Sequence, residues 1–284
     1  MNFKHTLPKI SISNAVNIPK VNEESFSLLN ALANDGQNIY RASSGRDGLE
    51  KLLSYLKING LCSKIDIRTA SGNSYVSSCV SNVVKNIAEY SINGYSPEAD
   101  VVLIIHEFGY LAPERVFQNP QSALLIEDYA YSMATFLSES YPRPKSNFRI
   151  FSFSKFLPFQ SGGAIGSDTK MPFLEMIDSI FLSEIQIKKW AKKQKRNLNY
   201  LSKKIILSKG VFFESYFGVP EVAVLKTNLN PSQMNKFKAL LNNAGIESTI
   251  YFGNNAIIIP CGFSLTEEQL VYIIEVCNEF AEKL

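Results

Sequence analysis

Three short segments carry residue types that could act together in chemistry. Residues 43–48 (SSGRDG) precede a stretch with helical spacing, and small residues at a helix start leave backbone N–H groups free for a phosphate. Asp128 follows an apolar strand, where ligands bind in α/β sheets. Lys155 follows another apolar strand, and a buried lysine there has a lowered pKa and could form a Schiff base.

Two of these segments have a simpler explanation when each is taken alone. A Ser-Gly pair before a helix is most often a cap, and an aspartate after a strand often caps the next helix. Lys155, which precedes Gly162 and Gly163, is harder to explain as a surface residue. Pyridoxal phosphate needs what the three segments offer together: an anion cradle, an acid that keeps the pyridine nitrogen protonated, and an amine for the aldehyde. The set therefore predicts pyridoxal phosphate as a cofactor.

The composition argues against several other kinds of chemistry. The 284 residues include two histidines, His5 and His106, whereas most zinc enzymes and most serine or cysteine triads need histidine. The four cysteines are scattered without the spacing of a metal or redox site, so we expect no metal. A net charge of +3 is too mild to indicate nucleic acid or a membrane surface as a partner.

The location of the protein is expected to be cytoplasmic. Residues 1–20 contain no long apolar run of the kind that forms the core of a signal peptide, and no later stretch reaches transmembrane length. The simplest interpretation of the scattered cysteines is that their thiols stay reduced.

Residues 38–167 alternate short apolar runs with helical patterns. Residues 101–105 (VVLII) and 124–126 (LLI) are continuous apolar runs, typical of strands that are buried on both faces. Residues 148–153 predict a further strand, and residues 49–56 have helical spacing. This alternation predicts an α/β domain with a mostly parallel sheet.

The remainder of the chain predicts a small α+β domain. Residues 176–207 have the pattern of one long helix, and its many lysines indicate a solvated face, although charge blocks sometimes mark a binding patch. Strands are expected at 222–227, 246–252 and 256–260, and helices at 231–244 and 266–284, the last capped by Thr266. We therefore predict a large domain at 1–180, with an N-terminal arm, and a linking helix with a small domain at 181–284.

Several segments together resemble the DegT/StrS-type aminotransferases, most of which make amino sugars on nucleotide-activated substrates. IEDYAYS and FSFSKFLPFQSGGAIGSD resemble the aspartate and lysine segments of that family. SSGRDGLEKLL resembles its phosphate-loop helix, SGNSYVSSCVSNVV the segment with an aromatic over the cofactor ring, and VVLIIHEFGY the strand that ends in His-x-x-Gly. The matches are collinear from Ser43 to Asp168. The resemblance implies a fold-type I transferase, with a three-layer α/β/α large domain and a small C-terminal α+β domain.

The resemblance implies roles for the residues that match. Lys155 would form the Schiff base with the cofactor and, once freed by substrate, would act as the base that moves the proton. Asp128 would pair with the pyridinium nitrogen. Tyr75 falls where the family stacks an aromatic on the cofactor ring, with a core aromatic as the alternative. His106 is expected to support the cofactor strand and not to act in catalysis.

The resemblance also places the cofactor phosphate. Ser44, Gly45 and Arg46 would cradle it, and Ser152 would add a hydroxyl. Arg46 stands where the family usually has a small hydroxyl residue, so its bidentate phosphate contact is inferred from its own chemistry. Tyr131 stands where the family usually has His or Gln near the phenolic oxygen of the cofactor.

Other departures bear on the substrate. Phe156 follows the lysine where many members have asparagine, and the chain is shorter than typical members. No arginine follows Arg196, so the small domain lacks an arginine clamp for an α-carboxylate, which favours a sugar-type acceptor. We expect a homodimer that transfers an amino group from an amino acid such as glutamate to a nucleotide-linked keto-sugar, in amino-sugar or surface-polysaccharide biosynthesis. Decarboxylation or dehydration on the same cofactor, and a regulatory role, are the alternatives.

Overall fold

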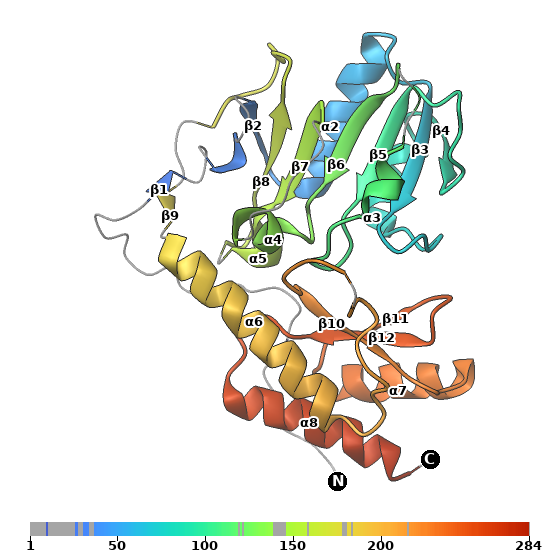
Figure 1. Cartoon of the computed structure of the whole chain (residues 1–284), viewed down its shortest axis with the longest axis vertical. Coiled ribbons are helices and arrows are strands. Elements are labelled where there is room, and N and C mark those ends of the chain that lie inside the picture. The colour runs from blue at the N-terminus through green and yellow to red at the C-terminus, as the bar shows by residue number, and fades with distance from the viewer. Residues whose placement is uncertain are drawn as a thin grey trace.

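The computed structural model describes residues 10, 26–27, 31–33, 37–118, 120, 122–138, 146–157, 159–177, 181–182, 184–214 and 216–283. Most of the N-terminal arm predicted from the sequence lies outside these residues. Figure 1 shows two parts, a large sheet with its helices and, below it, a small sheet with the last helices of the chain. None of the helices in the described ranges has both the length and the apolar character needed to cross a membrane.

The large sheet has seven strands in the order β2-β8-β7-β6-β5-β3-β4 (Figure 1). Strands β3 to β7 run parallel to one another, whereas β8 is antiparallel to both of its neighbours, β7 and β2. This is the mostly parallel sheet predicted from the sequence. The bounds are β2 (Asn38–Ala42), β3 (Lys64–Thr69), β4 (Glu89–Ile92), β5 (Val101–Ile105), β6 (Leu124–Asp128), β7 (Phe148–Ser152) and β8 (Gly163–Ser167).

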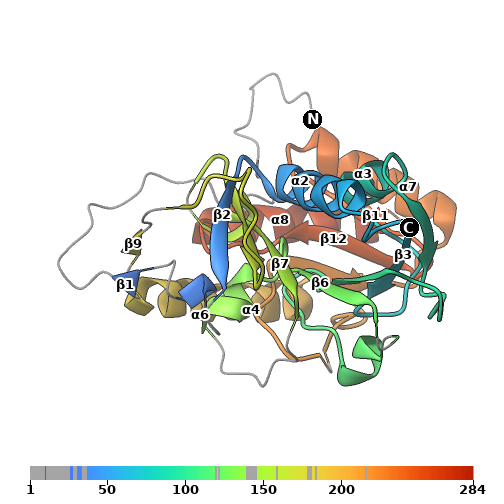
Figure 2. The same cartoon turned by 90° about the horizontal axis from the view of Figure 1, so that it is seen from above.

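The apolar runs of β5 and β6 are uninterrupted because the sheet is covered on both faces. Val101 and Leu103 of β5 pack in the cluster with α2 (Gly45–Ile58) and α3 (Ser78–Val84). Val102 and Ile104 point to the other face, where they pack with Val116 of the short 3₁₀ helix η1 (Glu114–Phe117). Figure 2 shows α2 and α3 on one side of the sheet, and α4 (Met133–Ser138) and α6 (Glu184–Lys204) on the other. The large part therefore has the three predicted layers.

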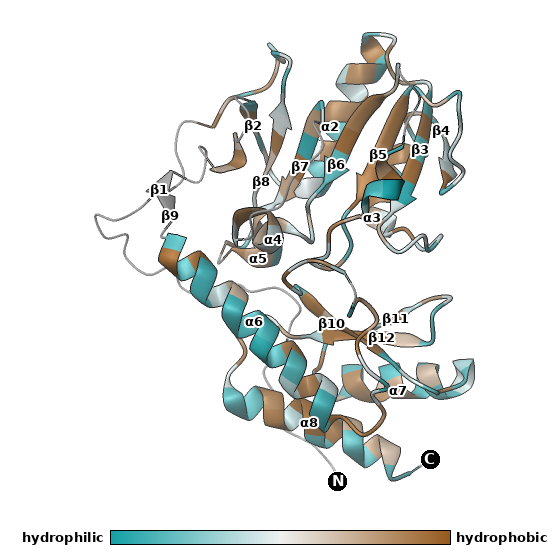
Figure 3. Ribbon diagram, viewed as in Figure 1, coloured by the Kyte–Doolittle hydropathy of each residue, from teal (hydrophilic) through white to brown (hydrophobic). Residues whose placement is uncertain are grey.

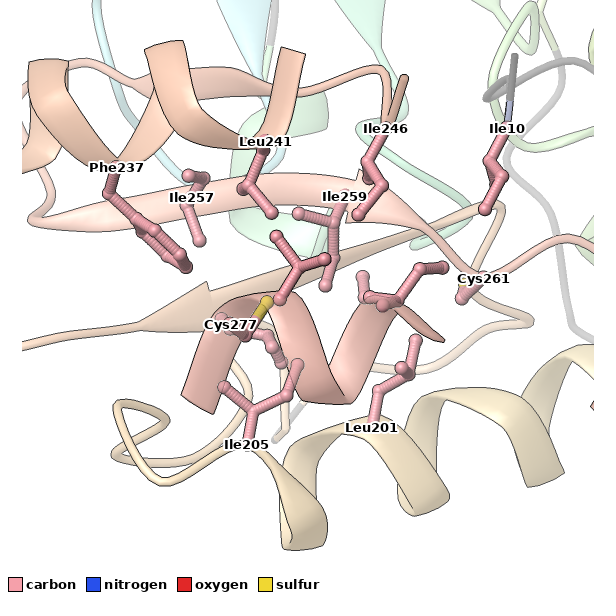
Figure 4. Packing of buried hydrophobic residues seen from close by; sticks show 14 of the residues in the cluster. Ile10, Leu201, Ile205, Phe237, Leu241, Ile246, Ile257, Ile259, Cys261 and Cys277 are labelled. Atoms are coloured by element: carbon pink, nitrogen blue, oxygen red, sulfur yellow. The ribbon is translucent and has the colours of Figure 1, made fainter. Parts of the chain in front are cut away.

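The small part has a three-stranded antiparallel sheet in the order β10-β12-β11. Its strands are β10 (Val222–Lys226), β11 (Thr249–Tyr251) and β12 (Ala256–Pro260), and its helices are α7 (Pro231–Asn243) and α8 (Glu267–Ala281). Thr266 caps α8 as predicted, in a capping box with Gln269. Figure 4 shows Ile257 and Ile259 of β12 packed between Leu241 of α7 and Leu201 of α6.

Helix α6 carries its lysines on the exposed side, and Figure 3 shows this side as mostly hydrophilic. The prediction that the helix extends over 176–207 is wrong at its start. Ile177 instead donates its backbone N–H to Ile39, and β9 (Phe181–Leu182) pairs with β1 (Phe26–Ser27). Pairing with distant segments overrides the local helical pattern there. The boundary predicted between residues 180 and 181 falls beside residues outside the described ranges and stays a prediction.

Strand β11 is shorter than the strand predicted at 246–252. Ile246 does not join it but forms an isolated parallel bridge with Ile10. The predicted strand is therefore wrong at its beginning, because the segment first pairs with the N-terminal part of the chain and only then enters the small sheet.

The two parts are joined where residues 217–221 cross the loop 108–111. Leu111 donates its N–H to the carbonyl of Phe217, and Glu221 donates to that of Phe108, both at 3.0 Å. Gly109 has a φ of +103°, and a Cβ on it would lie 1.9 Å from the carbonyl oxygen of Val219. This crossing therefore requires glycine at position 109, since no side chain fits between the two backbones.

Candidate active site

A cavity of about 350 Å³ lies at the carboxyl ends of β5, β6 and β7. The small sheet supplies its opposite lining through Val222, Thr249 and Ile258. This volume is in the range of small-molecule sites, and the position is the one that ligands take in α/β sheets. All eight site residues predicted from the sequence line this one cavity: Ser44, Gly45, Arg46, Tyr75, Asp128, Tyr131, Ser152 and Lys155.

The first turn of α2 has the groups that an anion site would need. The helix begins at Gly45, earlier than the sequence pattern suggests, and Ser44 is its N-cap, whose hydroxyl accepts the N–H of Asp47 at 3.2 Å. The N–H groups of Gly45 and Arg46 have no acceptor within the helix. A Cβ on Gly45 would lie 3.1 Å from that of Ser152, so a glycine leaves space beside the serine. Free amides, the helix dipole and a nearby hydroxyl suit a phosphate.

Arg46 contacts a cysteine of the neighbouring helix α3 that sequence reasoning missed. Its guanidinium donates a hydrogen bond to Sγ of Cys79, in α3, at 2.8 Å. Burial raises the pKa of the Cys79 thiol, but Arg46, Ser77 and Lys155 together outweigh this effect, so the pKa lies below its ordinary value. The only signal in the sequence was the place of Cys79 in the segment that also carries Tyr75, which does not reveal the contact with α2.

Asp128 is the last residue of β6 and not, as predicted, the residue after the strand. Its side chain is buried, and one carboxylate oxygen accepts the N–H of Ala130 at 2.8 Å. Burial raises the pKa of this carboxyl to about 6, although the hydrogen bond from Ala130 and the neighbouring His106 act in the opposite direction. A cation placed against Asp128 would recover the electrostatic energy that burial costs the carboxylate.

His106 lies behind Asp128 with both ring nitrogens engaged. Nε2 is 3.1 Å from a carboxylate oxygen of Glu127, and Nδ1 accepts the N–H of Ala112 at 2.9 Å. The acceptor role of Nδ1 assigns the proton to Nε2. The ring also lies 4.2 Å from that of Tyr129, measured between centroids. These contacts fit the supporting role expected for His106.

Lys155 lies in α5 (Phe153–Phe156), a single turn that follows β7 directly. Its Nζ donates a hydrogen bond to Oη of Tyr131 at 2.8 Å. Burial lowers the pKa of this amine, but Tyr131, Cys79 and Glu221 raise it by more, so the net pKa is above its ordinary value. The expectation of a lowered pKa is therefore wrong: the partners of Lys155 outweigh its burial.

Tyr75 lines the cavity from the loop between β3 and α3. Its ring packs edge-on against Tyr251 of β11, at 6.0 Å between centroids, and lies 5.8 Å from the ring of Phe252. Tyr75 thus contacts the small sheet while one side faces the cavity. The stacking of Tyr75 on a cofactor ring stays a prediction.

Two buried glutamates near the cavity were not found from the sequence. Glu107 lines the cavity and accepts hydrogen bonds from the N–H of Ser71, at 2.7 Å, and from Oη of Tyr251, at 2.8 Å. Glu221 accepts the N–H of Ala134 at 3.2 Å, and burial raises its pKa to about 8, against the effects of that bond and of Lys155. Glu107 occupies a variable position of the His-x-x-Gly segment, and Glu221 lies in no motif that the sequence analysis identified. The sequence pattern therefore gave no signal for either carboxyl.

Comparison with known proteins finds similar structures but no similar sequences. No family model and no curated protein matches the sequence. Spr1654 from Streptococcus pneumoniae, named as a sugar aminotransferase and solved in its PMP form, is 12% identical, covers 90% of this chain and 91% of its own, and has a TM-score of 0.66. A DegT DnrJ EryC1 StrS aminotransferase from Brucella abortus is 14% identical, with 85% of each chain covered and a TM-score of 0.58.

A NifS-like protein has the same fold, with 15% identity, a TM-score of 0.66 and coverage of 90% of this chain and 86% of its own. At such identities the likeness concerns the fold. It confirms the predicted architecture: the chain shares the fold of these three proteins, an α/β large part followed by a small α+β part.

Proposed function

We propose that the protein is a pyridoxal phosphate-dependent aminotransferase of the DegT/DnrJ/EryC1/StrS type. The observation that carries this proposal is the meeting of Lys155, Asp128 and the start of α2 in one cavity. An amine, a buried acid and a helix N-terminus come from three separate segments of the chain. They are the three kinds of group that this cofactor needs.

The residues present fit the cofactor. The amides of Gly45 and Arg46, the Arg46 guanidinium and the Ser152 hydroxyl would hold its phosphate. Asp128 would hold a proton on its ring nitrogen, and Lys155 would bind its aldehyde. When bound, the cofactor supplies an electron-withdrawing ring that stabilises charge next to the reacting carbon. Lys155 then moves a proton at its Nζ, and Asp128 keeps the ring cationic through its buried carboxylate.

The fold alone does not define the reaction, because one structural neighbour is named NifS-like and others are named aminotransferases. The named sugar aminotransferases favour a keto-sugar as acceptor. The cavity supports this, since Glu107 and Thr249 offer groups that can bind hydroxyls. We further propose an amino acid such as glutamate as donor, and a homodimer as the assembly. The cytoplasmic location stays a prediction.

The test begins with the cofactor. Purified protein is titrated with pyridoxal phosphate, reduced with borohydride and digested, and the modified peptide is identified by mass spectrometry. We expect the label on Lys155, and its loss in Lys155→Ala but not in the control Lys226→Ala, which alters an exposed lysine of β10. A protein that takes up no cofactor would reject the proposal.

The reaction class is tested next with amino acids. Glutamate alone should convert the bound cofactor to pyridoxamine phosphate, because a transaminase stores the amino group on its cofactor. A decarboxylase or dehydratase would consume its substrate and keep the aldehyde form, and a regulatory protein would do neither. If no amino acid in a broad panel yields pyridoxamine phosphate while Lys155 is still labelled, decarboxylation or elimination becomes the leading function.

A further inference from the structure

We infer that Tyr131 is a positioning residue that fixes the Lys155 amine in the cavity and keeps it protonated. The inference deepens the proposed function and rests on it, since it concerns the amine that would bind the cofactor. It starts from the hydrogen bond between Lys155 and Tyr131, which joins residues 24 positions apart at 2.8 Å.

The tyrosine ring is held independently of the lysine. Tyr131 lies in the turn between β6 and α4, and its ring is 6.0 Å from that of Phe108, which in turn packs edge-on against Tyr251 at 5.4 Å. The Lys155 Nζ lies 4.5 Å from the centroid of the Tyr131 ring. The amine therefore has two attractions to one fixed side chain, the hydroxyl oxygen and the electron-rich ring. A flexible lysine side chain is thus directed to one place in the cavity.

The hydroxyl also affects the charge of the amine. As an acceptor, Oη stabilises the ammonium form of Lys155 and not the neutral form. Two other titratable groups also act on the amine: Cys79 of α3, itself bonded to Arg46, and Glu221, which precedes β10. Of these groups, Tyr131 makes the direct hydrogen bond. Removing only its hydroxyl should favour the neutral amine, which is the form that attacks a carbonyl.

The experiment measures Lys155 directly, without cofactor. The full chain is treated with trace acetic anhydride over a range of pH, and the labelling of each lysine is quantified by mass spectrometry to obtain its titration midpoint. Tyr131→Phe keeps the ring and its packing but removes the hydroxyl. Tyr200→Phe, on the exposed side of α6, is the matched control.

We expect the midpoint of Lys155 to fall by about one pH unit in Tyr131→Phe, which corresponds to roughly tenfold more neutral amine at neutral pH. The midpoints of other lysines, and that of Lys155 in Tyr200→Phe, should not move. An unchanged Lys155 midpoint in a folded Tyr131→Phe variant would overturn the inference. The result is separate from the test of function: failure to bind pyridoxal phosphate would reject the cofactor but would not move the labelling midpoint.

Discussion

At the scale of single residues, burial and hydrogen bonding have opposing effects on the pKa values of the groups in and near the cavity. Burial raises the pKa of Asp128 to about 6 and that of Glu221 to about 8, so each carboxyl holds its proton more tightly than an exposed acid does. Lys155 shows the opposite balance, because its partners raise its pKa despite its burial. The pKa values of all three groups therefore lie above their ordinary values.

The first prediction concerns Asp128 and pH. Its carboxylate can pair with a pyridinium cation only above its pKa of about 6, so the affinity for pyridoxal phosphate should fall as the pH drops below this value. Asp128→Asn should bind about tenfold to a hundredfold more weakly at pH 8, since a hydrogen bond to a charged group is worth roughly 1.5–3 kcal/mol. The difference in affinity between the original protein and Asp128→Asn should become smaller toward pH 5. Absorbance titrations at several pH values measure this, and equal affinities at pH 8 would contradict the proposed role.

The second prediction concerns Glu221 and stability. Its folded pKa of about 8 lies above its value of about 4.3 in an unfolded chain, so the folded state holds an extra proton between these limits. The free energy of unfolding should therefore fall as the pH rises through this window, by an amount on the order of a few kcal/mol. Glu221→Gln keeps an oxygen for Ala134 and should lose this dependence.

Urea unfolding at pH 5, 7 and 9 tests this prediction. Glu275→Gln, which changes an exposed glutamate of α8, is the control and should keep the pH profile of the original protein. If the unfolding free energy of Glu221→Gln falls with rising pH as steeply as that of the control, the Glu221 carboxyl does not cause the pH dependence.

At the scale of elements, the sequence predicts the bounds of those helices and strands that local residue patterns determine. The strand at 101–105 and the strand at 256–260 have the predicted bounds, because their apolar runs are set by burial within one sheet. The helix predicted from 176 fails where Ile177 bonds to Ile39, a contact with no local signal. The eight predicted site residues all line one cavity. The hydrogen bond between Lys155 and Tyr131 could not be predicted, because it depends on how a turn and a short helix are placed relative to each other, and no motif encodes that placement.

The third prediction concerns the crossing of the loop 108–111 and residues 217–221. Gly109→Ala should cost at least about 4 kcal/mol of unfolding free energy, because its Cβ would lie 1.9 Å from the Val219 oxygen. Gly60→Ala is a matched control: Gly60 has a φ of +71°, but nothing lies within 4 Å of its Cβ position. That change should cost only the strain of the left-handed backbone, about 1–2 kcal/mol. Chemical denaturation compares the two, and similar losses would show that the crossing can relax.

At the scale of the whole molecule, the cavity depends on both parts of the chain. The large part supplies Asp128 from β6 and Lys155 from α5, whereas the small sheet supplies Val222, Thr249 and Ile258. The bond from Tyr251 to Glu107 ties the two parts together beside the cavity. Any motion of the small part relative to the large part would therefore change the shape of the site.

The fourth prediction concerns the assembly. The resemblance to the DegT/StrS-type aminotransferases implies an active site at a subunit interface, so the purified chain should sediment as two subunits at micromolar concentration. Binding of pyridoxal phosphate should then decrease when the protein is diluted until it dissociates. A monomer with full activity at all concentrations would contradict the shared site.

The pairing of β2 with β8 has a consequence for how the protein is made. Ala42 pairs with Gly163, and the carbonyl of Ser43 accepts the N–H of Gly162, so the segment that leads into α2 is held by a strand far later in the sequence. During synthesis on the ribosome, the first of these strands emerges long before its partner, and such distant pairing forms late. A partly made chain thus lacks the support for the start of α2, so we expect any phosphate binding at this position only after the large sheet is complete.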